Sequence, residues 1–309
     1  MTKKHLFGNV ILLLTAIIWG SAFVAQRSGL DFMGPFTFNG VRSFIGAAAL
    51  GLFLLLRALF TRSSLKFTLK ELAYGAVCGA ILFAASTSQQ AGLATVSAGR
   101  AGFLTALYII LVPIIRALGG KKLRPCVIGA VALAMLGLFM LSASSADMPD
   151  GKFSLTALFA GFSFGDVLVI ISALCYSFHI IAVDAFAPNM DSVKLSWLQF
   201  LICGIISLPF IFIFDGPIPV IGFDSGLFEL LYAGVMSSGV AYTLQILGQK
   251  LSPNPTVASV LMSTESVFAV IFGVIILRES HTLIEYLGCA LVFAAVILVQ
   301  LPKRAATNK

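Results

Sequence analysis

Charged and polar side chains inside long apolar stretches are the residues of this 309-residue sequence that could do chemistry. Glu265 has nine apolar or small residues on each side. A charge at the centre of a bilayer costs about 2.5–3.5 kcal/mol on insertion scales, so a carboxyl there requires a reason. Glu265 could bind an amine or take up a proton, because a carboxyl buried without a charged partner favours its protonated form. A purely structural interhelical hydrogen bond is the alternative.

Two further ionisable side chains lie within apolar stretches. Arg42 could attract an anionic group or pair with Glu265, but its long stem also allows it to reach outward to the membrane surface. His179 could relay protons near neutral pH, or be a hydrogen-bonded packing residue. For both residues the functional and the structural interpretation stay open.

Other polar and aromatic residues recur at helical spacing, which places them on common helix faces. Such stripes would suit an apolar or aromatic ligand, but ordinary helix packing would produce them as well. Glutamines in two other segments could recognise zwitterionic groups or hold helices together. The three sets are Thr15, Trp19, Phe23 and Gln26; Ser172, Tyr176 and His179; and Gln89, Gln90, Gln245 and Gln249.

The composition indicates which elements position these residues. The chain is 59% hydrophobic and 11% charged, whereas soluble proteins carry about 25% charged residues. A soluble enzyme and a secreted domain are therefore excluded. The chain is predicted to be an all-α membrane protein with ten transmembrane helices, because each crossing needs about 20 apolar residues. The predicted spans are 8–27, 36–57, 70–91, 98–117, 124–143, 164–184, 195–214, 227–249, 256–277 and 283–301.

The few charges predict the orientation of the chain. With the N-terminus inside, 15 of the 20 Lys and Arg residues fall on the inner side and four on the outer side, and Arg42 lies within a span. An excess of basic residues marks the cytoplasmic side, so both termini are expected there. Because the charges lie at segment ends, the net charge of +7 does not indicate nucleic-acid binding. The five cysteines are isolated, which supports neither a metal site nor a disulfide framework.

The two halves of the chain resemble each other. Residues 8–10 (Gly-Asn-Val) match 165–167 (Gly-Asp-Val) at a shift of 157, and Gly75 matches Gly234 at a shift of 159. We expect a first repeat over 8–143, a linker over 144–163 and a second repeat over 164–301. Five helices per repeat is an odd number, so the second copy must be inverted. Inverted repeats are typical of secondary transporters, whose substrate sites lie at the repeat interface.

Three segments resemble the EamA type of the drug/metabolite transporter superfamily, and the resemblance covers about 8–301. They are Thr15-Ala16-Ile17-Ile18-Trp19-Gly20-Ser21, Ser97-Ala98-Gly99-Arg100-Ala101-Gly102-Phe103-Leu104, and Glu265-Ser266-Val267-Phe268-Ala269-Val270 followed by Leu277-Arg278-Glu279. The resemblance implies a 5+5 inverted-repeat fold with a central cavity. Ser266 replaces the usual proline, and we expect Leu107 to be the counterpart of Glu265 in the first repeat.

The resemblance implies a secondary transporter of the bacterial inner membrane that moves a small metabolite, amino acid or drug-like molecule by alternating access. Export is favoured over import, proton coupling through Glu265 is possible, and no cofactor is expected. Expected partners are the small-molecule substrate and the lipid bilayer. The substrate site is predicted to comprise Trp19, Phe23, Gln90, Tyr108, Tyr176, His179, Gln245 and Glu265. The alternatives are a membrane-embedded enzyme and an uncoupled channel. Against the enzyme, the sequence contains no HExxH motif.

Overall fold

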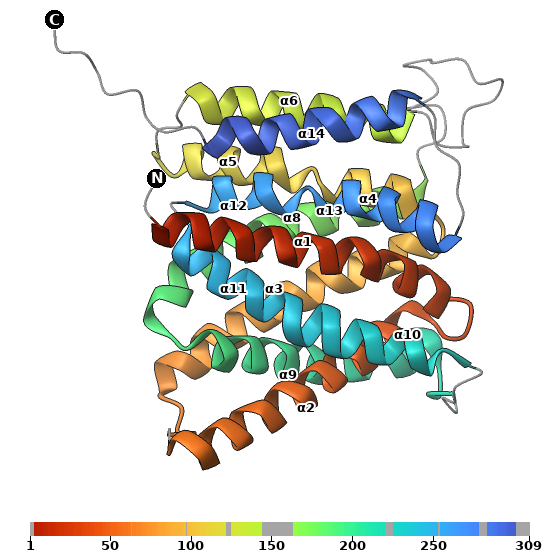
Figure 1. The fold of residues 1–309 in the computed structure, drawn as a ribbon. Helices are drawn as coiled ribbons and strands as arrows, with labels where there is room; N and C mark the ends of the chain where they lie inside the picture. Colours follow the sequence, from red (N-terminus) through yellow and green to blue (C-terminus); the bar gives the residue numbers. More distant parts are fainter. Residues whose placement is uncertain are drawn as a thin grey trace, which may run out of the picture.

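The computed structural model describes residues 3–62, 64–96, 98–121, 125–143, 163–219, 225–252, 254–277 and 283–300. Throughout these residues the regular secondary structure is helical (Figure 1). The elements are α1 (Lys3–Gly29), α2 (Pro35–Thr61), α3 (Leu69–Leu93), α4 (Ala98–Thr105), α5 (Tyr108–Leu118), α6 (Pro125–Ala143), α8 (Phe164–Phe186), η2 (Ala187–Asn189), α9 (Ser192–Phe210), η3 (Ile211–Asp215), α10 (Leu227–Leu231), η5 (Tyr232–Ala241), α11 (Tyr242–Leu251), α12 (Pro255–Met262), α13 (Glu265–Phe272), η6 (Gly273–Leu277) and α14 (Leu283–Gln300).

Eight helical stretches in the described part of the chain are long and apolar enough to cross a membrane. Several of them join elements that follow one another without a loop, such as α9 with η3 and α10 with η5 and α11. Two shorter apolar stretches, Pro125–Met140 and Tyr286–Val299, occupy the places of the fifth and tenth predicted spans. The predicted linker over 144–163 lies outside the described residues except for Ser163.

Local sequence signals explain where several helices begin. Thr68 and Glu71 form a reciprocal capping box at the start of α3, and Ser163 and Asp166 form the same motif at the start of α8. Such boxes satisfy backbone N–H groups that have no partner within the helix. The start of α12 uses Asn254 as its N-cap, followed by Pro255, whose fixed φ angle suits the first helical turn.

The helices pack mainly against partners from the other half of the sequence (Figure 1). The helix α1 packs against α11, η5 and α13, while α8 packs against α3, α4 and α5. Likewise α2 contacts η5 and α9, and α9 contacts α3. The pair α6 and α14 lies side by side at one edge of the bundle. Neither half therefore forms a separate bundle of its own.

Polar contacts join α2 to the continuous stretch of α9 and η3 at both ends of that stretch. At one end the Arg57 guanidinium donates to both carboxylate oxygens of Asp191, at 3.0 and 3.3 Å. Burial alone would raise the pKa of the Asp191 carboxyl, but hydrogen bonds from Arg57 and from two backbone N–H groups outweigh it and lower this pKa. At the other end Asp215 accepts a 2.6 Å hydrogen bond from the backbone N–H of Thr37. Each link joins the end of one helix to the beginning of the other.

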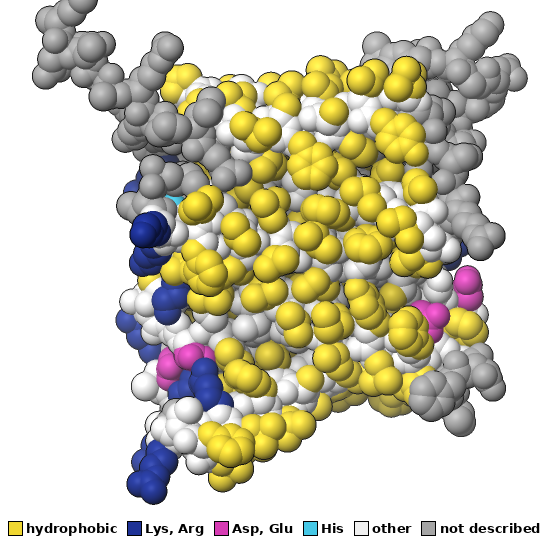
Figure 2. Space-filling view, viewed as in Figure 1, with side chains coloured by type: hydrophobic (Ala, Val, Ile, Leu, Met, Phe, Trp, Pro, Cys, Tyr) yellow, Lys and Arg dark blue, Asp and Glu magenta, His cyan; other side chains and the backbone are white. Residues whose placement is uncertain are grey.

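The exterior is apolar across the middle and charged at the ends of the helices. Figure 2 shows hydrophobic side chains over most of the visible face and most of the visible Lys and Arg side chains along its left edge. Large apolar side chains such as Phe60, Phe212 and Ile213 are 85%, 62% and 70% exposed. Contiguous apolar surface of this extent would aggregate in water, whereas a lipid bilayer solvates it. The molecule is a multi-pass membrane protein.

Candidate functional site

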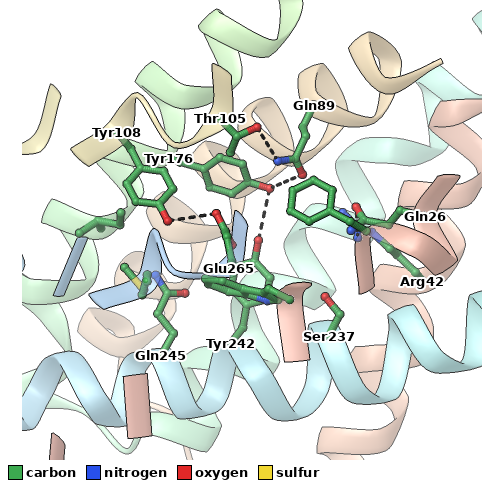
Figure 3. Close-up of a pocket in the computed structure, with 14 residues that line it drawn as sticks. Gln26, Arg42, Gln89, Thr105, Tyr108, Tyr176, Ser237, Tyr242, Gln245 and Glu265 are labelled. Carbon is green, nitrogen blue, oxygen red and sulfur yellow. Dashed lines mark hydrogen bonds between the residues drawn. The ribbon is translucent and has the colours of Figure 1, made fainter. Parts of the chain in front are cut away.

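The helices enclose a pocket near the centre of the bundle with an empty volume of about 480 Å³, including the part that is open to solvent. Figure 3 shows polar side chains reaching it from several helices of both halves. Its walls also carry three tyrosines, a tryptophan and a phenylalanine. The lining residues are Trp19, Phe23, Gln26, Arg42, Gln89, Thr105, Tyr108, Tyr176, Ile180, Ser237, Tyr242, Gln245, Met262 and Glu265.

The pocket brings together six of the eight residues that the sequence predicts for the substrate site: Trp19, Phe23, Tyr108, Tyr176, Gln245 and Glu265. The other two, Gln90 and His179, do not line it. Five lining residues were not singled out from the sequence: Thr105, Ile180, Ser237, Tyr242 and Met262. A signal was available for Tyr242, because it precedes Gln245 by three positions and therefore lies on the same helix face.

Glu265 meets a tyrosine from the first half of the chain. The side chain is 5% exposed, and its Oε1 accepts a 3.0 Å hydrogen bond from the Tyr108 hydroxyl (Figure 3). Both residues begin a helix immediately after an interruption: Tyr108 follows the turn at 106–107, and Glu265 follows the turn at 263–264. The two interruptions are 157 residues apart, so Tyr108, rather than the expected Leu107, occupies the position that matches Glu265.

A second set of hydrogen bonds crosses the pocket from α11 to α4. The Tyr242 hydroxyl donates to the Tyr176 hydroxyl at 3.4 Å, and Tyr176 donates to Gln89 Oε1 at 3.2 Å. The Gln89 amide in turn donates to Thr105 Oγ1 at 3.0 Å. These bonds fix the orientation of side chains from four helical segments and define one polar wall (Figure 3).

Gln90 points in another direction because consecutive helical residues differ by about 100° around the axis. Its Nε2 donates to the backbone carbonyl of Gln26 at 3.2 Å, and its side chain is completely buried. Gln90 therefore joins α3 to α1, and its neighbour Gln89 faces the pocket instead.

His179 lies behind the pocket wall. Its Nε2 is 3.0 Å from Gln199 Oε1 on α9, and its ring packs edge-on against the lining residue Tyr242 with ring centroids 6.0 Å apart. The α8 residues that face the pocket are Tyr176 and Ile180, one helical turn apart. The position of His179 between them in sequence turns its side chain toward α9.

Arg42 reaches the pocket from α2 and is 4% exposed. Its Nε donates to Asn39 Oδ1, and one terminal nitrogen donates to Gln26 Oε1, both at 3.0 Å. The pairing of Arg42 with Glu265, which the sequence left open, is absent: among the described residues the ion pairs are Arg27–Asp31 and Arg57–Asp191. Both acceptors of Arg42 are neutral amides.

Two buried polar atoms of the lining have no hydrogen-bond partner within the described part of the chain. They are Trp19 Nε1, which is a donor, and Gln245 Oε1, which is an acceptor. The Trp19 ring packs edge-on against Tyr242 with centroids 4.8 Å apart. Buried polar groups are usually satisfied, so these two atoms are exceptions within the pocket lining. Within the described residues, no group of three His, Cys, Asp or Glu side chains could hold a metal ion.

These features define a class of protein: a multi-pass helical membrane protein with a pocket of aromatic and polar side chains between its helices. The model of the EamA-like transporter family matches residues 6–143 and again residues 163–301. The chain therefore belongs to the EamA-like transporter family, as its motifs predict, and it is a transporter.

Curated relatives and a solved structure agree with this assignment. An uncharacterized transporter of Archaeoglobus fulgidus is 31% identical, with 96% of this chain and 87% of that protein aligned. A WAT1-related chloroplastic protein of Arabidopsis thaliana is 23% identical over 95% of this chain and 69% of its own length. The uncharacterized transporter YoaV of Bacillus subtilis is 22% identical over 93% of this chain and 94% of its own length. A solved crystal structure at 17% identity, with a TM-score of 0.75, covers 95% of this chain and 98% of its own and supports the fold alone.

Proposed function

We propose that this protein is a secondary transporter that exports a small metabolite, amino acid or drug-like molecule by alternating access through the central pocket. The observation that carries this proposal is the hydrogen bond between Tyr108 and Glu265, at the point where one interrupted helix from each half meets the pocket. Interrupted helices near mid-membrane are a common way of building substrate sites in secondary transporters.

The proposed architecture is ten membrane crossings arranged as two inverted repeats of five. In this arrangement α6 and α14 are crossings, although their apolar stretches, Pro125–Met140 and Tyr286–Val299, are shorter than the other eight. Packing supports the symmetry, since α1 against α11 and η5 is matched by α8 against α3, and α2 against η5 by α9 against α3. Each of these contacts thus has a counterpart in which the equivalent helices of the two halves trade places. A pocket between the halves can then open to either side when they rock against each other.

The proposed location is a bacterial inner membrane, with both termini in the cytoplasm. Basic residues at the start of α1, the end of α2, the start of α3 and the end of α11 support this orientation: Lys3, Lys4, Arg57, Lys70 and Lys250. In an antiparallel bundle these positions share one side, and an excess of Lys and Arg marks the cytoplasmic side. Lys309 in the C-terminal segment lies outside the described residues.

Glu265 is the proposed site of proton coupling, because it is the buried carboxyl of the pocket and has no basic partner among the described residues. Replacing Glu265 by Gln keeps the shape and the hydrogen bond from Tyr108 but removes the exchangeable proton. We expect Glu265→Gln to abolish flux driven by a pH gradient in proteoliposomes, with unchanged thermal unfolding. The control is Glu229→Gln, at the end of the bundle. A normal response of Glu265→Gln to the gradient would show that the coupling residue is elsewhere.

A metabolite-resolved comparison tests export and identifies the substrate. Intracellular and extracellular pools are compared between a deletion strain, an overexpressing strain and a strain that overexpresses Glu265→Gln. Export predicts a compound that accumulates inside the deletion strain and outside the overexpressing strain. Import predicts the reverse, and chemical conversion of a metabolite by the purified protein without a gradient would favour an enzyme. Conductance that does not saturate would favour a channel.

A further inference from the structure

Arg42 carries a positive charge that no carboxylate of the described residues balances. The side chain is 4% exposed, lies within the span Pro35–Thr61 and lines the pocket. Removing a guanidinium from water without a counter-ion is costly, and buried charges in proteins are usually paired. The positive charge therefore has to be offset by something other than an ion pair within this part of the chain.

The contacts of Arg42 orient it rather than neutralise it. Asn39 and Gln26 supply neutral amide oxygens at 3.0 Å, and Asn39 is itself held by its 2.8 Å hydrogen bond to Thr87. A guanidinium has five N–H donors, and these contacts use two of them. The remaining donors form a flat fork, which suits the two oxygens of a carboxylate.

Glu265 supplies the carboxyl group of the pocket lining, but it does not serve as the counter-ion of Arg42. Its carboxyl is held by Tyr108 on the opposite side of the pocket from Arg42 and Gln26 (Figure 3). Aromatic side chains, including Trp19, Phe23 and Tyr242, form the pocket wall. The pocket thus combines a cationic group at one end with aromatic side chains along its wall.

We propose that the transported molecule is an organic anion whose carboxylate binds Arg42 and whose apolar or aromatic body packs against Trp19, Phe23 and Tyr242. This inference rests on the proposed function and names the substrate class of the same site. Arg42 and these three aromatic side chains line the same pocket, so one molecule can contact both.

The test uses three probes that share one ring and chain length: 3-phenylpropionate, the neutral 3-phenylpropionamide and the cationic 3-phenylpropylamine. The chain has two tryptophans. Trp19 lines the pocket, whereas Trp197 stacks on Phe67 away from it, with centroids 5.4 Å apart. In purified Trp197→Phe protein the emission of Trp19 therefore reports binding without requiring transport.

The proposal predicts that 3-phenylpropionate changes the Trp19 emission in a saturable way and binds at least about 10-fold more tightly than the amide or the amine, as a charged hydrogen bond implies. In the same background Arg42→Gln should weaken binding of the acid by about 10- to 100-fold and leave binding of the amide unchanged. Arg57→Gln, on the same helix but outside the pocket, should leave both affinities unchanged.

Equal affinity of the wild-type pocket for acid and amide overturns the proposal, and so does tighter binding of the amine. This comparison needs no variant at Arg42, so it holds even if Arg42→Gln fails to fold. Unchanged affinity of folded Arg42→Gln for the acid also overturns it. Selective binding of the acid without any flux in proteoliposomes would contradict the proposed transport function while leaving the anion site intact. Flux of a substrate that lacks an acidic group would contradict the anion site alone.

Discussion

Gly20 is the residue at which α1 crosses α13, and its replacement by alanine tests how closely these helices must approach. A Cβ atom at Gly20 would lie 2.5 Å from the Cβ of Phe268, 2.8 Å from the backbone nitrogen of Ala269 and 2.8 Å from the carbonyl oxygen of Glu265. Ordinary contacts begin at 3.4 Å, and none of these atoms is the end of a flexible side chain. The two helices would have to separate by about 1 Å.

The structure allows the size of the effect to be estimated. Overpacking of this kind costs about 1–3 kcal/mol. With an unfolding entropy of about 2.1 cal/mol/K per residue, each kcal/mol lowers the melting temperature of this 309-residue chain by about 1.5 °C. Gly20→Ala should therefore unfold about 2–5 °C below the wild type. The measurement is thermal unfolding of the purified protein in detergent. The separation would also displace the neighbouring Trp19 and Glu265, so flux should fall further than the loss of folded protein explains.

The matched control is Gly102→Ala on α4. A Cβ atom there would meet only Ser266 Oγ, at 3.9 Å, so the added methyl group fits without displacement. Alanine also favours the helical backbone over glycine. We expect Gly102→Ala to be as stable as the wild type or slightly more stable. Equal melting temperatures and equal flux for Gly20→Ala and Gly102→Ala would refute the argument that close approach of α1 and α13 shapes the pocket.

Three smaller effects follow from individual contacts. Asp191→Asn keeps an N-cap but loses the charge pair with Arg57, so it should cost at most about 1 kcal/mol. Because folding lowers the pKa of Asp191, its carboxylate contributes to the free energy of unfolding above about pH 4, and this contribution is lost as the pH falls further. The melting temperature measured against pH should show this loss in the wild type and not in Asp191→Asn. Thr68→Ala should lower the free energy of unfolding by about 1 kcal/mol, seen as a lower melting temperature, since it removes a capping box. Gln89→Leu leaves Tyr176 without its acceptor and should weaken substrate binding more than it lowers the melting temperature; the opposite ranking would contradict a role of Gln89 in the pocket.

Hydropathy alone predicted most of the helical elements. The predicted spans coincide with the helical stretches of the structure to within a few residues, for example 36–57 against Pro35–Thr61. The interruptions at 106–107 and 263–264 were missed, because neither contains Gly or Pro and so neither gives a strong helix-breaking signal. The counterpart of Glu265 was consequently placed one residue too early.

The candidate site was harder to predict because its members come from many helices whose rotation the sequence does not define. Aromatic residues at helical spacing identified Trp19 and Phe23 as neighbours on one face. The choice between Gln89 and Gln90 depends on how α3 is rotated against α1 and α8, and that rotation is set by packing between the halves. The same packing turns His179 toward Gln199 and away from the pocket.

Passage of the substrate through the central pocket is tested most directly by counterflow of the identified substrate in proteoliposomes that contain only this protein. Ser237 lines the pocket, so Ser237→Trp would fill it, whereas Leu55→Trp places the same side chain on the apolar exterior, where Leu55 is 53% exposed. We predict saturable counterflow for the wild type and Leu55→Trp, and its loss in folded Ser237→Trp. Normal counterflow in Ser237→Trp would show that the substrate does not pass through this pocket.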